Sequence, residues 1–401
     1  MRPFHALIPF GEAKRVIMES IFPPESTEEV RLEDCLGRVV AQDVVASLAH
    51  PPFNRSAMDG YAVRARDTFG ASQSAPKVFN IIGTQLAGSS SDFQVRAGQC
   101  IQIATGARMP RGADAVVMVE DAEREAEQLK VSRPVYPQAN VSRRGEDIDR
   151  GDVILRKESV LDAAKIGVLA SQGMKSIGVY QKPRVAVLSS GEEIAQVGEK
   201  LKQGQIYDIN SYTVSAVVQK SGGLPSLLGI TPDDVNSLKS AVSTAVDWDM
   251  VVISGGSSVG ERDLFFRVLQ DLGEVLFHGV QIKPGKPTIF GRINDTPVFG
   301  MPGYPTSCLL NAYLLLAPAI RKMAHLPHLT ENRATGKLGK AVSGSLGRRQ
   351  FLPVRLDGNT VVVVFKESGA ITSMSRADGY IEIAENIDLM EKGQEVEVTL
   401  F

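Results

Sequence analysis

RVAVLSSG (residues 184–191) and DMVVISGG (residues 249–256) are the two stretches that decide the fold of this chain. Each is an almost continuous apolar run of strand length that ends in small residues. Another such run, LLGIT (227–231), lies between them and is flanked by two segments with helical spacing, SYTVSAVVQKSGG (211–223) and DDVNSLKSAVSTAV (233–246). Continuous apolar strands that alternate with helices predict a parallel sheet covered by helices on both faces.

The rest of the chain differs from this pattern on both sides. Helical spacing at residues 11–22 and again at 159–180, where Gly173 is a candidate C-terminal cap, predicts two helices that pack together as one small discontinuous domain. Short apolar runs bounded by turns predict a β-rich module between them and an all-β domain at the C-terminal end. The expected domain limits are 1–46 with 146–181, 47–145, 182–326 and 327–401.

Composition excludes several classes of protein. The 401 residues include 44 basic and 46 acidic side chains, so the basic surplus typical of a nucleic-acid-binding protein is absent. The longest apolar stretch, residues 308–320, is interrupted by an asparagine and a proline and is too short to span a membrane. Cys35, Cys100 and Cys308 form no CxxC pair and are expected to be reduced thiols. A cytoplasmic protein is expected, with neither nucleic acid nor membrane as a partner.

Small and charged residues follow the predicted strands of the α/β domain. They form SSGEE (189–193), TPDD (231–234), SGGSSVGERD (254–263), KPGKP (283–287) and GMPGYPTS (300–307). Glycine lets the backbone approach a ligand closely, and exposed amides at helix starts favour anions. Because ligands bind at the carboxyl ends of parallel strands, these loops predict a site for a phosphate or an oxyanion.

Carboxylates in the same loops would repel an anion unless a cation lies between them. Mg²⁺ fits best, because oxygen ligands and substrate phosphates complete its octahedral shell. Lys283 and Lys286 would neutralise an oxyanion directly. Simple strand-to-helix turns with capping residues are the alternative interpretation for SSGEE and TPDD, and a rigid solvated turn is the alternative for KPGKP. The carboxylates are Glu192, Glu193, Asp233, Asp234, Glu261 and Asp263.

The β-rich module contributes three polar motifs. They are PPFNRSAMDGYAV (51–63), IATGARMPRGADAVV (103–117) and RRGEDI (143–148). Asp59 before Gly60 is also typical of a simple turn, and RRGEDI is also typical of a surface cluster of salt bridges.

Together and in this order, the motifs resemble the molybdopterin molybdenumtransferase (MoeA-like) family, which includes the E domain of gephyrin and its plant counterpart. The match also includes GQIYDIN (204–210), GRRQFLPVRL (347–356) and SGAITSMSRADGYI (368–381), and it extends from about Pro51 to Tyr380. The resemblance implies a multidomain α/β and β fold: a central doubly wound α/β molybdopterin-binding domain, an inserted β-rich domain, a small discontinuous α/β domain and a C-terminal β-barrel.

The resemblance also implies the activity, which is insertion of molybdate into adenylylated molybdopterin with release of AMP. It implies Mg²⁺ as the metal and a homodimer whose active sites combine residues of both subunits. Tungstate is an alternative oxyanion, because it has the same charge and nearly the same geometry. Contact with the molybdopterin adenylyltransferase is a further expectation. Tyr304 departs from the asparagine common in bacterial relatives.

Matching the motifs residue by residue gives the expected site. The expected catalytic residues are Asp59, Glu193, Asp233 and Asp263, and three of these carboxylates (Asp59, Asp233 and Asp263) are also the expected metal ligands. The expected substrate-binding residues are Thr105, Arg143, Arg144, Asp147, Gly255, Gly256, Ser257, Ser258, Lys283, Lys286, Pro302, Pro305, Ser368 and Ser373.

Two other functions fit parts of the pattern. Molybdopterin adenylyltransferases use a related α/β domain with a glycine-rich loop, but the MDGYAV module and the C-terminal domain favour molybdate insertion. A non-catalytic pterin-binding scaffold is the second alternative, since function belongs to sites rather than folds. The acidic residues expected of an active enzyme are present in this chain.

Overall fold

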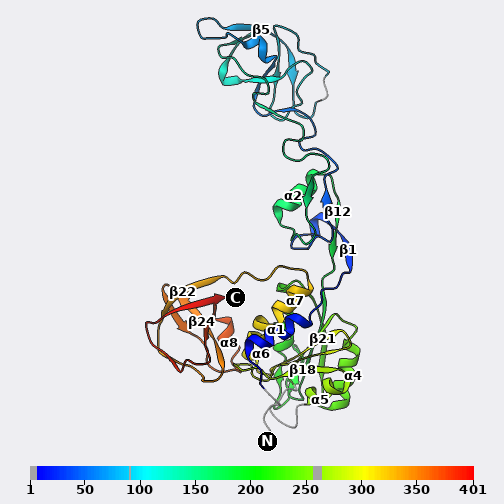
Figure 1. The fold of residues 1–401 in the computed structure, drawn as a ribbon, viewed down its shortest axis with the longest axis vertical. Helices are drawn as coiled ribbons and strands as arrows, with labels where there is room; N and C mark the ends of the chain where they lie inside the picture. Colours follow the sequence, from blue (N-terminus) through cyan, green and yellow to red (C-terminus); the bar gives the residue numbers. More distant parts are fainter. Residues whose placement is uncertain (1–6, 90–91, 256–263) are drawn as a thin grey trace. The chain divides into compact units, whose positions relative to one another are not determined.

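The computed structural model describes residues 7–89, 92–255 and 264–401. The chain divides into two compact units (Figure 1). Unit 1 contains the chain up to Glu28 and from Tyr180 to Phe401, and unit 2 contains Glu29–Val179. Among the described residues, no helix has both the length and the apolar character that crossing a bilayer requires.

A six-stranded sheet forms the centre of unit 1. Its first four strands are parallel, as predicted, whereas the fifth runs in the opposite direction and pairs antiparallel with both the fourth and the sixth. The reason is the short connection at Asn294 and Asp295, because a two-residue link can join only antiparallel neighbours. In spatial order the strands are β16 (Leu224–Thr231), β13 (Arg184–Ser190), β17 (Met250–Ser254), β21 (Thr296–Met301), β20 (Ile289–Ile293) and β18 (Glu274–His278).

Both faces of this sheet are buried, as the continuous apolar strands predict. Val185 and Val187 of β13 belong to one apolar cluster, and the alternate residues Ala186 and Leu188 belong to another. Side chains alternate between the faces of a strand, so each cluster lies on its own face. The first cluster includes α3 (Asn210–Lys220), α6 (Pro305–Asn311) and α7 (Ala317–Met323), and the second includes α4 (Val235–Ala245) and α5 (Leu264–Leu272).

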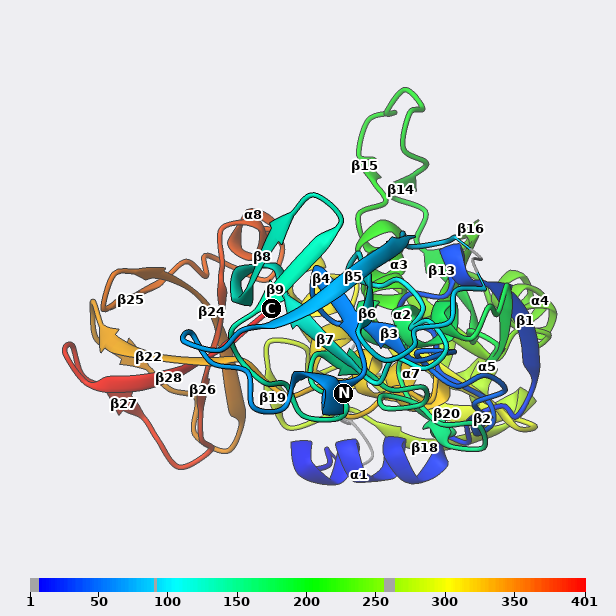
Figure 2. The same ribbon diagram turned by 90° about the horizontal axis from the view of Figure 1, so that it is seen from above.

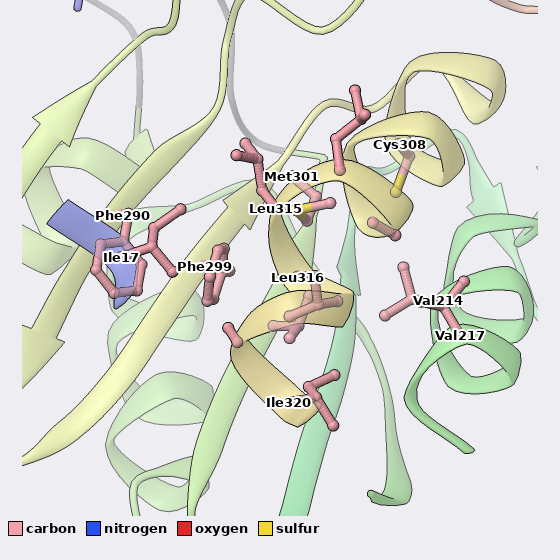
Figure 3. Packing of buried hydrophobic residues seen from close by; sticks show 14 of the residues in the cluster. Ile17, Val214, Val217, Phe290, Phe299, Met301, Cys308, Leu315, Leu316 and Ile320 are labelled. Atoms are coloured by element: carbon pink, nitrogen blue, oxygen red, sulfur yellow. The ribbon is translucent and has the colours of Figure 1, made fainter. Parts of the chain in front are cut away.

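The N-terminal helix α1 (Phe10–Ser20) packs differently from the prediction. Its buried residues Phe10, Ala13 and Ile17 belong to the first cluster of unit 1 and not to the 159–180 segment. Figure 3 shows Ile17 in the same cluster as Phe290. Helical spacing identifies the apolar stripe of a helix, but it does not identify the surface that buries this stripe.

The C-terminal region is a closed β-barrel. Five strands pair in turn, and a further pairing between the first and the last closes the ring. The short strand β19 (Ile282–Lys283) adds to the barrel by parallel pairing with β24. The five strands are β24 (Arg349–Asp357), β25 (Thr360–Val363), β22 (Arg333–Leu338), β28 (Glu395–Leu400) and β26 (Gly379–Ile383).

Unit 2 combines a β-rich sheet with a small α/β part. The small part pairs β1 (Thr27–Arg31) with β12 (Ser176–Tyr180) and β2 (Val44–Val45) with β11 (Val153–Leu155), beside helix α2 (Ala163–Ser171). Gly173 follows α2 with a φ of 72°, as expected of a helix C-terminus. The sheet order is β7 (Ala115–Met118), β4 (Gly60–Val63), β6 (Gln99–Ile103), β5 (Lys77–Gln85), β9 (Gln128–Val131) and β8 (Ala122–Glu125).

Replacing Ile17 by alanine tests the position of α1. Ile17 is 1% exposed, and removing a buried isoleucine side chain costs about 2–5 kcal/mol of unfolding free energy. We expect a loss of that size in urea-induced unfolding of Ile17→Ala. Arg15→Ala is the control, because Arg15 forms only an exposed pair with Glu19, which is worth less than about 0.5 kcal/mol. Equal losses in the two variants would show that α1 is not part of this core.

Candidate functional site

The crevice between β13 and β17 is where the connections of the sheet diverge. The chain leaves β13 toward α3 on one face and leaves β17 toward α5 on the other. Such a switch point is the usual ligand site of an open α/β sheet. Ser189 and Ser254 are paired at the ends of the two strands, and their buried hydroxyls lie 3.1 Å apart. These observations make the crevice the first candidate site.

Gly255 follows β17 directly and needs to be glycine. Its φ is +86°, and a Cβ there would collide with the carbonyl oxygen of Ser190. A third loop joins the other two, because a Cβ on Gly303 would lie 3.7 Å from the Gly255 Cα. Asn210 supports that loop with a 2.8 Å hydrogen bond from Nδ2 to the Gly303 carbonyl. The loops after β13, β17 and β21 therefore meet at one place.

Other expected residues of this domain lie on the same loops or outside the described part. Pro302 is buried at the end of β21, and Pro305 occupies the first turn of α6. Proline is suited to that position because no helical hydrogen bond needs its missing N–H. The residues outside the described part are Gly256, Ser257, Ser258, Glu261 and Asp263.

The adjacent carboxylates Asp233 and Asp234 have different partners. Asp234 caps α4 by accepting a 3.0 Å hydrogen bond from the Ser237 N–H, and hydrogen bonds with Ser237 lower the pKa of Asp234. Asp233 is exposed and accepts a hydrogen bond from Ser190 Oγ beside the crevice. The capping interpretation of TPDD therefore holds for Asp234, while Asp233 is free to face a ligand.

Glu193 adds a second carboxylate at the end of β13. Its side chain folds back over the loop, so that a Cβ on Gly191 would lie 2.8 Å from Glu193 Oε2. Asp233, Glu193 and the Ser190 hydroxyl together offer oxygen donors, which are the ligands that Mg²⁺ prefers. Within the described ranges, no three His, Cys, Asp or Glu side chains are grouped to hold a metal. The donor chemistry at this edge fits Mg²⁺.

A cavity of about 280 Å³ lies against α3 and the edge strand β16. Leu227 and Ile230 belong to its apolar wall, and Asp208 adds a carboxylate that is only 7% exposed. Ser211 also lines the cavity, and its hydroxyl is 2.8 Å from Ser189 Oγ. Hydrogen-bonded serines thus connect the cavity with the crevice. The loop that carries β14 (Ile194–Ala195) and β15 (Ile206–Tyr207) borders the cavity and projects from the domain (Figure 2).

The KPGKP loop brings two lysines beside the barrel. Lys283 Nζ donates a 2.9 Å hydrogen bond to Ser345 Oγ of the barrel. Burial lowers the pKa of Lys286, and the positive charge of Arg348 lowers it further. Strand β19 also pairs with β24, so that Ile282 and Lys283 lie opposite Arg349 and Gln350, next to Arg348. Lys283, Lys286 and Arg348 are therefore called the basic cluster. Arg348 and Ser345 were not predicted as site residues, because the GRRQF motif alone does not indicate which side chain faces the lysines.

The two C-terminal serines differ in access. The Ser368 carbonyl accepts a 2.9 Å hydrogen bond from the Thr306 N–H, which ties this segment to the GMPGYPTS loop. Ser373 has no exposed surface, and its hydroxyl accepts a 3.1 Å hydrogen bond from the Lys366 N–H. Ser368 is therefore half-buried beside this loop, whereas Ser373 stabilises the segment from within.

In unit 2, Asp59 is hydrogen-bonded to Thr105 of the IATGARMPRGADAVV motif. Its Oδ1 accepts a 2.7 Å hydrogen bond from the Thr105 N–H, and this bond lowers the pKa of Asp59. Asp59 is exposed, so it presents a carboxylate at the surface of the unit. The loop before β4, which ends at Asp59, and the loop after β6 therefore meet at this carboxylate.

The RRGEDI motif is hydrogen-bonded to the chain segment that precedes Asp59. The Arg144 N–H donates a 2.8 Å hydrogen bond to Asn54 Oδ1, and the Asp147 N–H donates one of 3.1 Å to the His50 carbonyl. Among the described residues, neither Arg143 nor Arg144 forms an ion pair, so the predicted alternative of a salt-bridge cluster is not observed. Both arginine side chains are exposed and able to meet an anionic ligand.

Replacing each aspartate of the adjacent pair by alanine separates their roles. Loss of an N-cap destabilises a helix, so we expect Asp234→Ala to lower the melting temperature by roughly 2–4 °C. Asp233→Ala removes no cap and should leave the melting temperature within about 1 °C of the unchanged protein. Thermal unfolding followed by circular dichroism measures both. Greater destabilisation by Asp233→Ala would show that Asp233, and not Asp234, supports the fold.

Comparison with known proteins covers nearly the whole chain. Family models match residues 8–173 (MoeA N-terminal region, domains I and II), 186–322 ("probable molybdopterin binding domain") and 335–401 (MoeA C-terminal region, domain IV). The molybdopterin molybdenumtransferase of Haemophilus influenzae is 32% identical, with 98% of this chain and 99% of the relative covered. That of Bacillus subtilis is 33% identical, with 98% and 94% covered.

A solved structure agrees with these relatives. The molybdopterin biosynthesis MoeA protein from Pyrococcus horikosii superposes with a TM-score of 0.87 at 41% identity, covering 98% of this chain and 99% of that one. The order of the three matched regions is that of the motifs in the sequence. The chain belongs to the MoeA family.

Proposed function

We propose that this chain is a molybdopterin molybdenumtransferase that inserts molybdate into adenylylated molybdopterin and releases AMP. The observation that carries the proposal is the meeting of three glycine-containing loops at the switch point of the α/β domain, in a chain similar over its full length to enzymes of that name. We also propose that the protein acts in the cytoplasm, where Cys35, Cys100 and Cys308 stay reduced; all three are unpaired and buried.

The crevice and the cavity beside it suit an adenylylated pterin. The Gly255 and Gly303 loops let a phosphate approach the backbone closely. The bicyclic ring would occupy the cavity, where the buried Asp208 carboxylate can accept hydrogen bonds from the N–H groups of the ring's pyrimidine edge. A site built to hydrogen-bond one substrate strongly rejects analogues that lack those groups.

Mg²⁺ would be held by Asp233 and Asp263, with Ser190 and Glu193 close by. When bound, the ion would reduce the repulsion between the phosphoanhydride and molybdate, both of which are anions. Asp233 is oriented for this role by the hydrogen bond from Ser190.

The basic cluster would bind the oxyanion. Lys283 and Lys286 supply point charges, and Arg348 adds a third positive charge. The Ser345 hydroxyl, which accepts a hydrogen bond from Lys283, can donate its own proton to molybdate or tungstate. Ser368 lies on a neighbouring segment. Fixed positive charges of this kind stabilise the charge that develops on the leaving AMP.

We further propose a homodimer in which residues of unit 2 from one subunit complete the site of the other. Asp59 and Asp147 would supply carboxylates toward the cation, and Thr105, Arg143 and Arg144 would contact the substrate. Support comes from the exposure of these side chains and from the absence of ion pairs at either arginine among the described residues. Contact with the adenylyltransferase that makes the substrate is part of the same proposal.

Release of AMP tests the function. On mixing the protein with adenylylated molybdopterin, molybdate and Mg²⁺, we expect AMP to form, to stop forming when EDTA is added, and to resume with excess Mg²⁺. Asp233→Ala and Asp59→Asn should reduce the rate at least about a hundredfold, because each removes a charge from the site. Asp234→Ala is the matched control and should retain the rate. Consumption of ATP with formation of pyrophosphate would instead assign the preceding adenylylation step.

Mixed dimers test the shared site. If Asp59 of one subunit acts with Asp233 of the other, a dimer of one Asp59→Asn subunit and one Asp233→Ala subunit contains one intact site. Random mixing of the two inactive proteins should then restore about a quarter of the unmodified rate. No recovery in dimers verified by native mass spectrometry would show that each subunit forms its site alone.

A further inference from the structure

Asn311 is a fully buried residue at the end of α6 that contacts the lysine loop. Its Nδ2 donates hydrogen bonds of 2.9 Å to the Gly285 carbonyl and 2.6 Å to Thr288 Oγ1. Gly285 has a φ of +102°, and a Cβ there would collide with the Asn311 amide. The loop and the asparagine therefore fit each other closely.

Further hydrogen bonds fix the buried side of the lysine loop (283–287). Thr288 Oγ1 donates a 2.8 Å hydrogen bond to the Gly285 carbonyl. The Lys286 carbonyl accepts bonds from the Val280 and Thr288 N–H groups, of 3.0 and 2.9 Å. Lys283 is exposed on the other side and contacts Ser345. The buried bonds thus fix the backbone from which the two lysine side chains extend.

The stability of the fold alone does not explain an asparagine at position 311. Among the described residues, no group donates a hydrogen bond to its buried Oδ1, and an unsatisfied buried acceptor destabilises a protein. Asparagine also has a low helix propensity, and a π-helical turn at Ala312–Leu316 follows it directly. Turns of this kind often occur at functional sites. A leucine of similar shape would bury apolar surface without an unsatisfied acceptor.

Asn210 shows the same arrangement at the neighbouring loop. It is 8% exposed, its Nδ2 donates to the Gly303 carbonyl, and its Oδ1 likewise has no donor among the described residues. Two buried asparagines with unsatisfied carbonyl oxygens therefore each hold the glycine carbonyl of one site loop. This repetition indicates a role in the site and not a defect of packing.

We propose that Asn311 is a positioning residue that fixes the Gly285–Lys286 backbone so that Lys283, Lys286 and Arg348 bind one oxyanion together. The identity of the oxyanion as molybdate rests on the proposed function. Asn311 itself is buried and does not touch the anion. Without its two hydrogen bonds the loop gains freedom, and the lysines lose part of the alignment that makes their charges act on the same ligand.

Binding of sodium molybdate to Asn311→Leu, measured by calorimetry on the full chain, tests this role. We expect about tenfold weaker binding, equivalent to about 1.4 kcal/mol. Thr288→Val removes the hydroxyl that accepts from Asn311 and donates to the Gly285 carbonyl, but Asn311 keeps its own bond to that carbonyl, so binding should weaken less than about threefold. Leu316→Ala is the control, because Leu316 is fully buried on the same helical run but belongs to the apolar cluster (Figure 3). It should lower stability and leave molybdate binding unchanged.

Hydrogen exchange of the backbone amides of Lys283, Gly285 and Lys286 supplies a readout that does not depend on the anion. Asn311→Leu should accelerate exchange there, and Leu316→Ala should not. Equal binding and equal exchange in Asn311→Leu and the unmodified protein would overturn the proposal. If the unmodified protein binds no molybdate, the proposed function fails, and exchange still decides whether Asn311 holds the loop. Asn311→Ala replaces Asn311→Leu if the leucine variant does not fold.

Discussion

The close approach of the Gly255 backbone to the Ser190 carbonyl is the constraint on which the site depends. It requires a glycine with positive φ at the end of β17, and it requires the parallel pairing of β13 and β17 that brings the two strand ends together. Helices on both faces make that pairing possible, because they bury the alternate residues of each strand. The loop after β21 joins these strand ends, and the Ser368 segment of the C-terminal region is hydrogen-bonded to that loop.

Local sequence patterns predicted the elements of this fold well. The burial of β13 on both faces, the cap after α2 and the closed barrel all follow from signals carried by neighbouring residues or by family motifs. Packing partners were less predictable. The apolar stripe of α1 indicated a buried face, but its partner is a surface formed by distant segments. The antiparallel strand β20 was likewise not predicted, because its sequence, IFGRI, is short and contains glycine and arginine.

The same difference between local features and contact partners holds for the candidate site. Motifs indicated which loops carry charge and assigned Asp59 and Thr105 to two polar loops of one module, but they did not predict the hydrogen bond that joins these loops. Local chemistry alone did not separate Asp233 from Asp234, because the choice between a helix cap and a side chain facing the crevice depends on where α4 begins; the family resemblance selected Asp233. They also did not identify Arg348 or Asn311, whose importance comes from contacts between segments far apart in the chain.

The polar groups of unit 1 are arranged in two layers with different tasks. Exposed charges at Asp233 and Lys283 face solvent, where a ligand can reach them. Behind them, the buried hydroxyls of Ser189, Ser211 and Ser254 and the amides of two asparagines hold the loops from the interior. Hydrogen bonds in such a low-dielectric layer are strong, and unsatisfied acceptors there are costly. A layer that keeps two such acceptors is therefore better explained by the geometry it imposes on the loops than by stability.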